Sequence, residues 1–201
     1  MNNIDDTKYK VNEIFYSLQG EGFYTGHAAV FIRFSGCNLK CPFCDTDFRK
    51  YTEMTKTEIL LEVAKYPTDL VVFTGGEPTL QLTASLIEGI HGLHKIAAIE
   101  TNGTRDVPDN IDWITVSPKN NYVSYSILKL KKANEVKVVM DDLVNYSDPT
   151  FNIEADYYYI QPCDTGDEKR NKAIIERVVK FIEDNPKYRL SLQTQKILHV
   201  R

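Results

Sequence analysis

The sequence lacks the long apolar segments of membrane-spanning or exported proteins. Nowhere in its 201 residues do roughly 20 apolar residues follow one another, which is the length that a helix needs to cross a bilayer. The first ten residues, MNNIDDTKYK, contain no apolar signal-peptide core. We therefore expect a cytoplasmic protein that is neither secreted nor bound in a membrane.

The chain also lacks the basic excess that is typical of nucleic-acid-binding proteins. Lys and Arg number 24 against 28 Asp and Glu, which gives a formal net charge of −4. The one short basic patch, Lys129, Lys131 and Lys132, is typical of a solvated surface. We expect no nucleic-acid partner.

No repeat, low-complexity tract or linker rich in Gly, Ser and Pro interrupts the chain. A chain of this length buries roughly 70% of its unfolded surface and needs no disulfide to hold its core. We expect a single domain over residues 1–201. Within it, about 28–46 form the first strand and a cysteine-rich loop, and about 145–201 complete the sheet.

Short β-branched or aromatic runs alternate with helical patterns along the chain. Runs typical of strands cover residues 28–34, 70–73, 96–99, 113–116, 136–139, 157–160 and 189–192. Helices are predicted after the capping box of Thr55 and Glu58, along an apolar stripe from Leu82 to Leu93, and over about 169–183. The last of these is expected to bury Ile174, Ile175, Val178, Val179 and Ile182. The alternation predicts an α/β fold with a largely parallel sheet or partial barrel.

Unusual polar combinations follow these strands at the points where they end. They are the cysteine loop after 28–34, Thr74-Gly75-Gly76-Glu77, Glu100-Thr101-Asn102-Gly103, Ser117-Pro118-Lys119 and Gln161-Pro162-Cys163-Asp164. Each alone is typical of a turn. Ligands of parallel α/β folds, however, bind at the carboxyl ends of the strands. Five such segments on one predicted face therefore favour a binding site.

Three of the four cysteines lie within eight residues: Cys37, Cys41 and Cys44, with the spacing C-x3-C-x2-C. This crowding without an export signal predicts reduced thiols rather than a disulfide framework. A structural zinc would need a fourth ligand, such as Cys163, a histidine or a carboxylate, and no second paired motif lies nearby. A four-iron cluster on three thiolates instead leaves one iron open to a ligand. A zinc-binding adaptor, colourless and with one zinc per chain, remains the alternative from a different class.

The cysteine loop, with Phe43 before its third cysteine, resembles the radical S-adenosylmethionine (SAM) superfamily, as does Gly75-Gly76-Glu77-Pro78 one strand later. The resemblance implies a single-domain partial (β/α) barrel. It also implies a [4Fe-4S] cluster on Cys37, Cys41 and Cys44, which makes these residues both metal ligands and catalytic. In that superfamily the open iron binds SAM, whose reductive cleavage yields a 5′-deoxyadenosyl radical.

Residues 13–22 (EIFYSLQGEG), together with Gly26, Phe31, Arg33, Gly36 and Cys44-Asp45-Thr46, resemble the 7-carboxy-7-deazaguanine synthases. The segments 117–119, 161–162 and 190–194 are also similar to that family. The resemblance implies a carbon–nitrogen lyase that converts 6-carboxy-5,6,7,8-tetrahydropterin to 7-carboxy-7-deazaguanine with loss of ammonia, for queuosine or another 7-deazapurine. It further implies SAM used catalytically, Mg²⁺, a homodimer and a flavodoxin- or ferredoxin-type reductant.

The same resemblance assigns the site residues. SAM would be contacted by Phe43, Gly76, Ser117, Pro118, Lys119, Gln161, Pro162, Cys163 and Asp164. The pterin would be contacted by Leu18, Gln19, Gly20, Arg33 and Thr74, with Glu21, Glu100 and Asn102 as further candidates for the pocket wall. Thr46 would bind Mg²⁺, although charge alone favours Asp45 or Asp47. Arg33 also has an independent argument, since its planar guanidinium suits a carboxylate.

The C-terminal side departs from the family pattern. Gln195 stands where relatives often have His, and the sequence ends in His199-Val200-Arg201 rather than in proline. No site residue is assigned there. The remaining alternative within the superfamily is a small glycyl-radical activase with the same cysteine spacing. Because such an activase needs an open apolar surface for a protein loop, Leu18-Gln19-Gly20, Arg33 and Thr46 argue against it.

Overall fold

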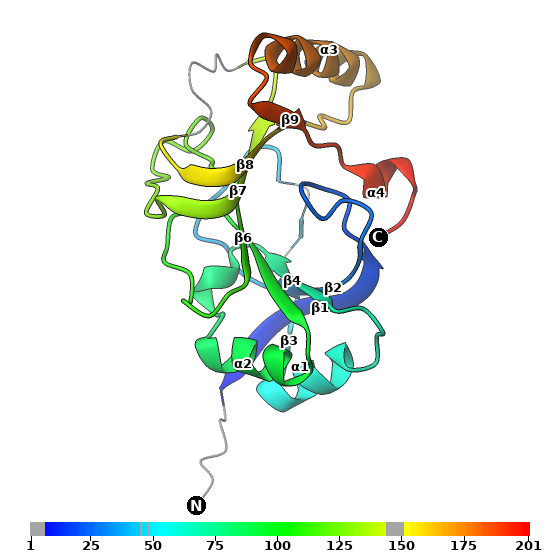
Figure 1. Cartoon of the computed structure of the whole chain (residues 1–201), viewed down its shortest axis with the longest axis vertical. Coiled ribbons are helices and arrows are strands. Elements are labelled where there is room, and N and C mark those ends of the chain that lie inside the picture. The colour runs from blue at the N-terminus through cyan, green and yellow to red at the C-terminus, as the bar shows by residue number, and fades with distance from the viewer. Residues whose placement is uncertain (1–6, 45, 48, 144–150) are drawn as a thin grey trace, which may run out of the picture.

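The computed structural model describes residues 7–44, 46–47, 49–143 and 151–201 of the chain (Figure 1). Asp45, one of the two carboxylates that charge alone favours for Mg²⁺, lies outside the described residues. Within the described ranges, no helix combines the length and the apolar character required to cross a membrane.

A nine-stranded sheet in the order β3-β1-β2-β4-β5-β6-β7-β8-β9 forms the centre of the molecule. Its strands are β1 (Lys8–Leu18), β2 (Ala28–Phe34), β3 (Thr52–Thr55), β4 (Leu70–Gly75), β5 (Ile96–Thr101), β6 (Trp113–Val116), β7 (Lys132–Met140), β8 (Glu154–Pro162) and β9 (Tyr188–Leu190). From β2 to β9 every neighbouring pair is parallel, whereas β1 pairs antiparallel with β2 and β3. The expected α/β fold with a largely parallel sheet is confirmed.

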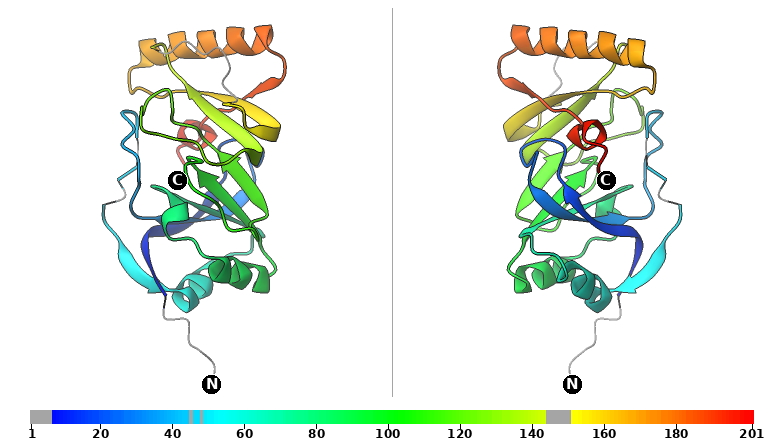
Figure 2. Two further views of the ribbon diagram at one scale, coloured as in Figure 1. Left: turned by 90° about the vertical axis from the view of Figure 1, so that its left-hand side faces the viewer. Right: turned by 90° about the vertical axis from the view of Figure 1, so that its right-hand side faces the viewer.

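The longer helices lie at two ends of this sheet, and one short helix lies between these ends, beside the β1–β2 loop (Figures 1 and 2). They are α1 (Lys56–Val63), α2 (Ala84–Gly92), α3 (Glu168–Asp184) and the short α4 (Thr194–Ile197), with a 3₁₀ turn η1 (Pro78–Leu80). α1 and α2 lie together at one end, and α3 lies at the other (Figure 2). The capping box that predicts the start of α1 is confirmed, because Thr55 accepts from the Glu58 backbone amide and Glu58 accepts from that of Thr55.

Two details of the predicted elements are wrong. Ile175 and Val179 of α3 are 42% and 40% exposed, whereas Ile174 and Val178 are fully buried. α3 packs on β8 and β9 with one narrow face, and positions four apart share that face while their next neighbours are rotated by about 100°. The last strand, expected at 189–192, is β9 and ends at Leu190.

Successive side chains of a strand point to opposite faces of the sheet, so one face contributes to the core and the other to the site. In β2, Val30, Ile32 and Phe34 belong to the buried core beneath α1 and α2. The intervening residues Phe31 and Arg33 line a cavity on the opposite, inner face of the sheet. The other parallel strands repeat this placement, with polar inner-face residues at or near their carboxyl ends: Thr74, Glu100, Thr115, Lys137 and Gln161. The register of the sheet thus gathers residues from six strands around one cavity.

Candidate active site

A cavity of about 560 Å³ occupies the inner side of the sheet at the carboxyl ends of the strands. Of the residues assigned to a site from sequence, the cavity is lined by Leu18, Gln19, Gly20, Arg33, Cys37, Cys41, Phe43, Cys44, Thr46, Thr74, Gly76, Ser117, Lys119, Gln161, Pro162, Cys163 and Asp164. Pro118 is buried between Ser117 and Lys119 and is not part of this lining. Segments far apart in the sequence therefore converge on one site.

The cysteine loop forms one wall of the cavity. Cys37 and Cys41 are partly buried, Cys44 is exposed, and all three are free thiols. Burial raises the pKa of the Cys37 and Cys41 thiols. Across the described part of the chain, no three His, Cys, Asp or Glu side chains converge on a point where they would hold a single metal ion. Three free thiols on one loop fit a four-iron cluster, because each thiolate of such a cluster binds a separate iron.

Gly76 joins the end of β4 to the cysteine loop. A Cβ atom at Gly76 would lie 2.0 Å from the carbonyl oxygen of Gly36 and 2.9 Å from Cβ of Cys37. The next amide, that of Glu77, donates to the same Gly36 carbonyl at 2.9 Å. Only a residue without a side chain permits this approach, so the Gly-Gly segment holds the cysteine loop against the sheet.

Glu77 is a structural residue rather than part of the cavity wall. Its fully buried carboxylate accepts hydrogen bonds from the Thr79 and Thr101 hydroxyls, at 2.6 and 2.7 Å, and from the Asn102 amide at 2.8 Å. It therefore ties the segment after β4 to the segment after β5. A buried charge is tolerated here because several donors satisfy it.

The segments after β6 and β8 carry groups suited to a zwitterionic ligand. Burial lowers the pKa of Lys119 to about 8, and its ammonium donates to the Ser117 carbonyl at 2.7 Å. Asp164 accepts from Lys196 and Asn171, both at 2.8 Å, and from the Gly166 amide at 3.0 Å. Cys163 is a buried free thiol whose amide donates to the Met140 carbonyl.

Arg33 lies at the side of the cavity nearest β1. Its Nε donates to Glu13 at 2.9 Å, and its Nη1 lies 3.4 Å from the Thr46 hydroxyl. The Arg201 guanidinium also contacts Glu13, and both guanidinium groups lie over the Phe15 ring, at 5.7 Å for Arg33 and 5.2 Å for Arg201. Two cations thus flank one carboxylate, and Thr46 lies beside the more buried of them.

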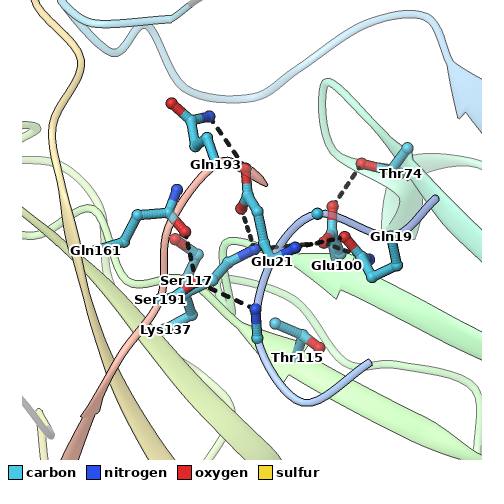
Figure 3. A network of polar contacts seen from close by, with 12 residues as sticks. Gln19, Glu21, Thr74, Glu100, Thr115, Ser117, Lys137, Gln161, Ser191 and Gln193 are labelled. Carbon is cyan, nitrogen blue, oxygen red and sulfur yellow. Dashed lines mark hydrogen bonds and ion pairs between the residues drawn. The ribbon is translucent and has the colours of Figure 1, made fainter. Parts of the chain in front are cut away.

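A polar network closes the cavity between β5, β7 and the β1–β2 loop (Figure 3). Glu21 Oε1 accepts from Gln193 and Gln195 at 3.0 and 3.1 Å, and its other oxygen contacts the ammonium of Lys137. Lys137 also contacts Glu100 at 3.3 Å. Glu100 also accepts hydrogen bonds from the Thr74 hydroxyl at 3.0 Å and from the Gln19 side-chain amide at 3.3 Å.

Sequence reasoning missed part of this network. Glu21 and Glu100 were candidates for the wall, but Lys137 and the C-terminal residues Gln193, Gln195, Lys196 and Arg201, which line the cavity, were not assigned. A signal for Lys137 exists, because it is a lysine between Val136 and Val138 in an apolar strand. Gln193 lies in the segment 190–194 that resembles the family, whereas no comparable pattern marks Gln195, Lys196 and Arg201. The Thr194 amide donates to the Gly20 carbonyl and holds this part of the chain beside the cavity.

Sequence comparisons identify the class of protein. Residues 31–147 match the Radical SAM superfamily, so the fold and the three-cysteine wall define a radical SAM enzyme, with the [4Fe-4S] cluster and SAM that this class uses. The 7-carboxy-7-deazaguanine synthase of Bacteroides thetaiotaomicron is 47% identical over 194 residues, which cover 96% of this chain and 98% of the relative. That of Haemophilus influenzae is 38% identical over 208 residues, covering 97% and 95%.

A solved structure shares the fold as well. The crystal structure of QueE from Escherichia coli matches with a TM-score of 0.74 and 25% identity, covering 92% of this chain and 93% of that one. The chain belongs to the 7-carboxy-7-deazaguanine synthase family. The alternatives of a glycyl-radical activase and of a zinc-binding adaptor are therefore wrong.

Proposed function

We propose that the protein converts 6-carboxy-5,6,7,8-tetrahydropterin to 7-carboxy-7-deazaguanine with loss of ammonia, a step toward queuosine or another 7-deazapurine. The observation that carries the proposal is the joint lining of one cavity by the three-cysteine loop, the Arg33 guanidinium and the carboxylates of Glu21 and Glu100. A radical source, an anion site and acceptors for ring N–H groups thus face one another. Both relatives are named 7-carboxy-7-deazaguanine synthase, which supports the same product.

Cys37, Cys41 and Cys44 would hold the [4Fe-4S] cluster, and none of the three is engaged in a disulfide. When bound, the cluster and SAM would supply the radical chemistry that the removal of a hydrogen atom from C6 of the substrate requires. Leu39 stabilises the loop locally, because its amide donates to Cys37 Sγ at 3.4 Å and its side chain is buried.

The residues of the cysteine loop and of the strand ends beside it would bind SAM. The Lys119 ammonium would meet the methionyl carboxylate, because a partly desolvated cation attracts an anion strongly. Phe43, whose ring packs edge-on against Tyr122 at 4.6 Å, offers an aromatic face for the adenine. The remaining contacts would come from Gly76, Ser117, Gln161, Pro162, the backbone of Cys163, and Asp164, with Pro118 holding Ser117 and Lys119 in place.

The pterin would lie between β1 and β5. Arg33 would receive its carboxylate, and the Thr74 hydroxyl and the Gln19 amide would reach its ring. Leu18 and Gly20 would contribute backbone groups at the same edge. Thr46, 3.4 Å from Arg33, would place Mg²⁺ beside the substrate carboxylate, since Mg²⁺ prefers oxygen ligands and retains several waters.

The wider setting of the enzyme follows from the family resemblance. The protein would be one domain over residues 1–201, would act in the cytoplasm as a homodimer, and would receive its electron from a flavodoxin- or ferredoxin-type protein. No nucleic-acid partner is expected, in keeping with a net charge of −4.

A pair of substrates tests the proposal. The reconstituted protein would receive SAM, dithionite and Mg²⁺ under anaerobic conditions, with either 6-carboxytetrahydropterin or the tetrahydropterin that lacks the carboxylate. Mass spectrometry should find a product lighter by one ammonia from the carboxylated substrate alone. SAM cleavage without that product, or equal conversion of both pterins, would contradict the proposal.

A further inference from the structure

Lys137 is a lysine buried in the inner face of the sheet. Its side chain is only 6% exposed, and it alternates along β7 with the core residues Val136 and Val138. Burying an ammonium group is unfavourable unless opposite charges and hydrogen-bond acceptors compensate it. The groups that surround Lys137 therefore account for its presence in this position.

Carboxylates from three elements surround the Lys137 ammonium. Glu21, from the β1–β2 loop, makes the closest contact, and Glu100, at the end of β5, lies 3.3 Å away. Glu135, two residues earlier in β7, adds electrostatic attraction, while the Lys119 ammonium opposes it. Among the described residues, the charges that face Lys137 are therefore three carboxylates and one other cation.

β7 also holds the loop that carries Glu21. The buried Glu135 carboxylate accepts from the Phe23 amide at 2.8 Å and from the Thr115 hydroxyl at 3.0 Å. Gly22 fits against the same carboxylate, since a Cβ atom there would lie 2.3 Å from Glu135 Oε1. Glu21 is thus fixed both through its backbone neighbours and through its own carboxylate.

The two carboxylates retain capacity for a ligand. An ionised carboxylate has about four acceptor positions. Among the described residues, Glu21 accepts from three donors: Lys137, Gln193 and Gln195. Glu100 likewise accepts from three donors: Lys137, Thr74 and Gln19. About one acceptor position therefore remains on each carboxylate, and both residues line the cavity.

We propose that Lys137 is a positioning residue of the substrate pocket, which holds the carboxylates of Glu21 and Glu100 side by side so that their remaining acceptor positions receive N–H donors of the substrate ring. The proposal rests on the proposed function and extends it to a residue beyond the substrate contacts. Lys137 acts through the two carboxylates and donates nothing to the reacting atoms.

The electrostatics agree with this geometry. Burial would lower the pKa of Lys137, but Glu100, Glu21 and Glu135 together raise it. Burial would likewise raise the pKa of Glu21, yet the charge of Lys137 and the hydrogen bonds from Lys137, Gln193 and Gln195 lower it. Across the neutral range, therefore, Lys137 stays protonated and Glu21 stays ionised.

The test compares Lys137→Met, which removes the charge, with Lys137→Arg, which keeps it. The control is Lys180→Met, which removes a lysine from an exposed ion pair with Asp184 on α3. Two readouts are used between pH 6 and 8.5: the KM for 6-carboxytetrahydropterin, and the affinity for 7-carboxy-7-deazaguanine measured by calorimetry without turnover. Iron content and SAM affinity are measured in parallel.

Lys137→Met should weaken substrate and product binding by roughly tenfold to a hundredfold, the usual range for hydrogen bonds to charged groups, with iron content and SAM affinity unchanged. Its affinity should fall further as the pH falls, because Glu21 takes up a proton more readily without the charge and hydrogen bond of Lys137 that lower its pKa. Lys137→Arg should recover most of the affinity and the flat pH profile of the wild type. Lys180→Met should behave as the wild type.

A Lys137→Met protein with wild-type KM and a flat pH profile would overturn the proposal. Equal losses of affinity in Lys137→Met and Lys137→Arg would also overturn it, because a loss that does not depend on the charge indicates that Lys137 acts through packing alone. If Lys137→Met does not fold, Lys137→Arg decides, because a pH-dependent affinity in a variant that keeps the charge contradicts the proposal and a flat profile supports it. A wild type that neither converts the pterin nor binds the product would instead overturn the proposed function.

Discussion

Gly76 lies directly against the carbonyl oxygen of Gly36, so closely that a Cβ atom at Gly76 would be 2.0 Å from it. The contact joins the carboxyl end of β4 to the start of the cysteine loop. Since the clashing atom belongs to the backbone, it cannot turn aside as a flexible side chain would. The orientation of Cys37, which follows β2, therefore depends on the absence of a side chain at Gly76, which follows β4.

Gly76→Ala should displace the cysteine loop. We expect the variant to bind less iron after reconstitution and to bind SAM at least about tenfold more weakly, the effect of losing roughly one charged hydrogen bond. Iron content and equilibrium dialysis of SAM measure both effects. Gly92→Ala is the control, because a Cβ atom at Gly92 in α2 would meet nothing within 4 Å. It should be neutral, or stabilising by up to about 1 kcal/mol.

Cys41→Ala should abolish the cluster and all turnover. The matched control is Cys163→Ala, because Cys163 is also a free cysteine in the cavity lining. Iron and sulfide analysis should find four irons per chain in the wild type and in Cys163→Ala, and no [4Fe-4S] cluster in Cys41→Ala. Normal cluster content in Cys41→Ala, or its loss in Cys163→Ala, would show that the ligand set is different.

Arg33→Ala should weaken substrate binding and spare the cluster. We expect the KM for the carboxylated pterin to rise roughly tenfold to a hundredfold, because a charge-assisted hydrogen bond to the carboxylate is lost. Arg201→Ala removes the other guanidinium beside Glu13 and Phe15, and its side chain is 69% exposed against 21% for Arg33. Steady-state kinetics should find a smaller effect for Arg201→Ala. A larger rise in KM for Arg201→Ala than for Arg33→Ala would indicate that Arg201, and not Arg33, binds the substrate carboxylate.

Thr46→Val should remove the response of activity to Mg²⁺. The substitution keeps the shape of the side chain but loses the hydroxyl that would bind the metal. Turnover measured across a Mg²⁺ titration should increase for the wild type and for Thr46→Ser and remain flat for Thr46→Val. If Thr46→Val still responds to Mg²⁺, a different oxygen, such as a carboxylate of Asp47, is the ligand.

The strand ends could be predicted from the sequence because local chemistry marks them. Each apolar run of a parallel strand stops at a polar segment, and parallel strands place those segments at one edge of the sheet. Arg33 and Thr74 illustrate this, since they are directly paired in the β2–β4 register and both line the cavity. The capping box at Thr55 is equally local and was equally predictable.

The contacts between distant segments could not be predicted in the same way. Strand β1 (Lys8–Leu18) carries Asn12 and Glu13 in the middle of its apolar pattern. Its extent as a strand therefore depends on its pairing with β2 and not on its own periodicity. Gln193 and Gln195 bind Glu21 only because the chain after β9 returns to the β1–β2 loop. Their geometry depends on tertiary packing, which neither periodicity nor motif spacing encodes.

The most direct test of the account is the ratio of 7-carboxy-7-deazaguanine formed to SAM consumed in one anaerobic reaction. In the proposed arrangement SAM and the pterin occupy neighbouring parts of one cavity, so that both would stay bound during the reaction. The account predicts many molecules of product for each SAM consumed, together with one ammonia per product. Consumption of SAM without 7-carboxy-7-deazaguanine, in protein with a verified cluster, would contradict it.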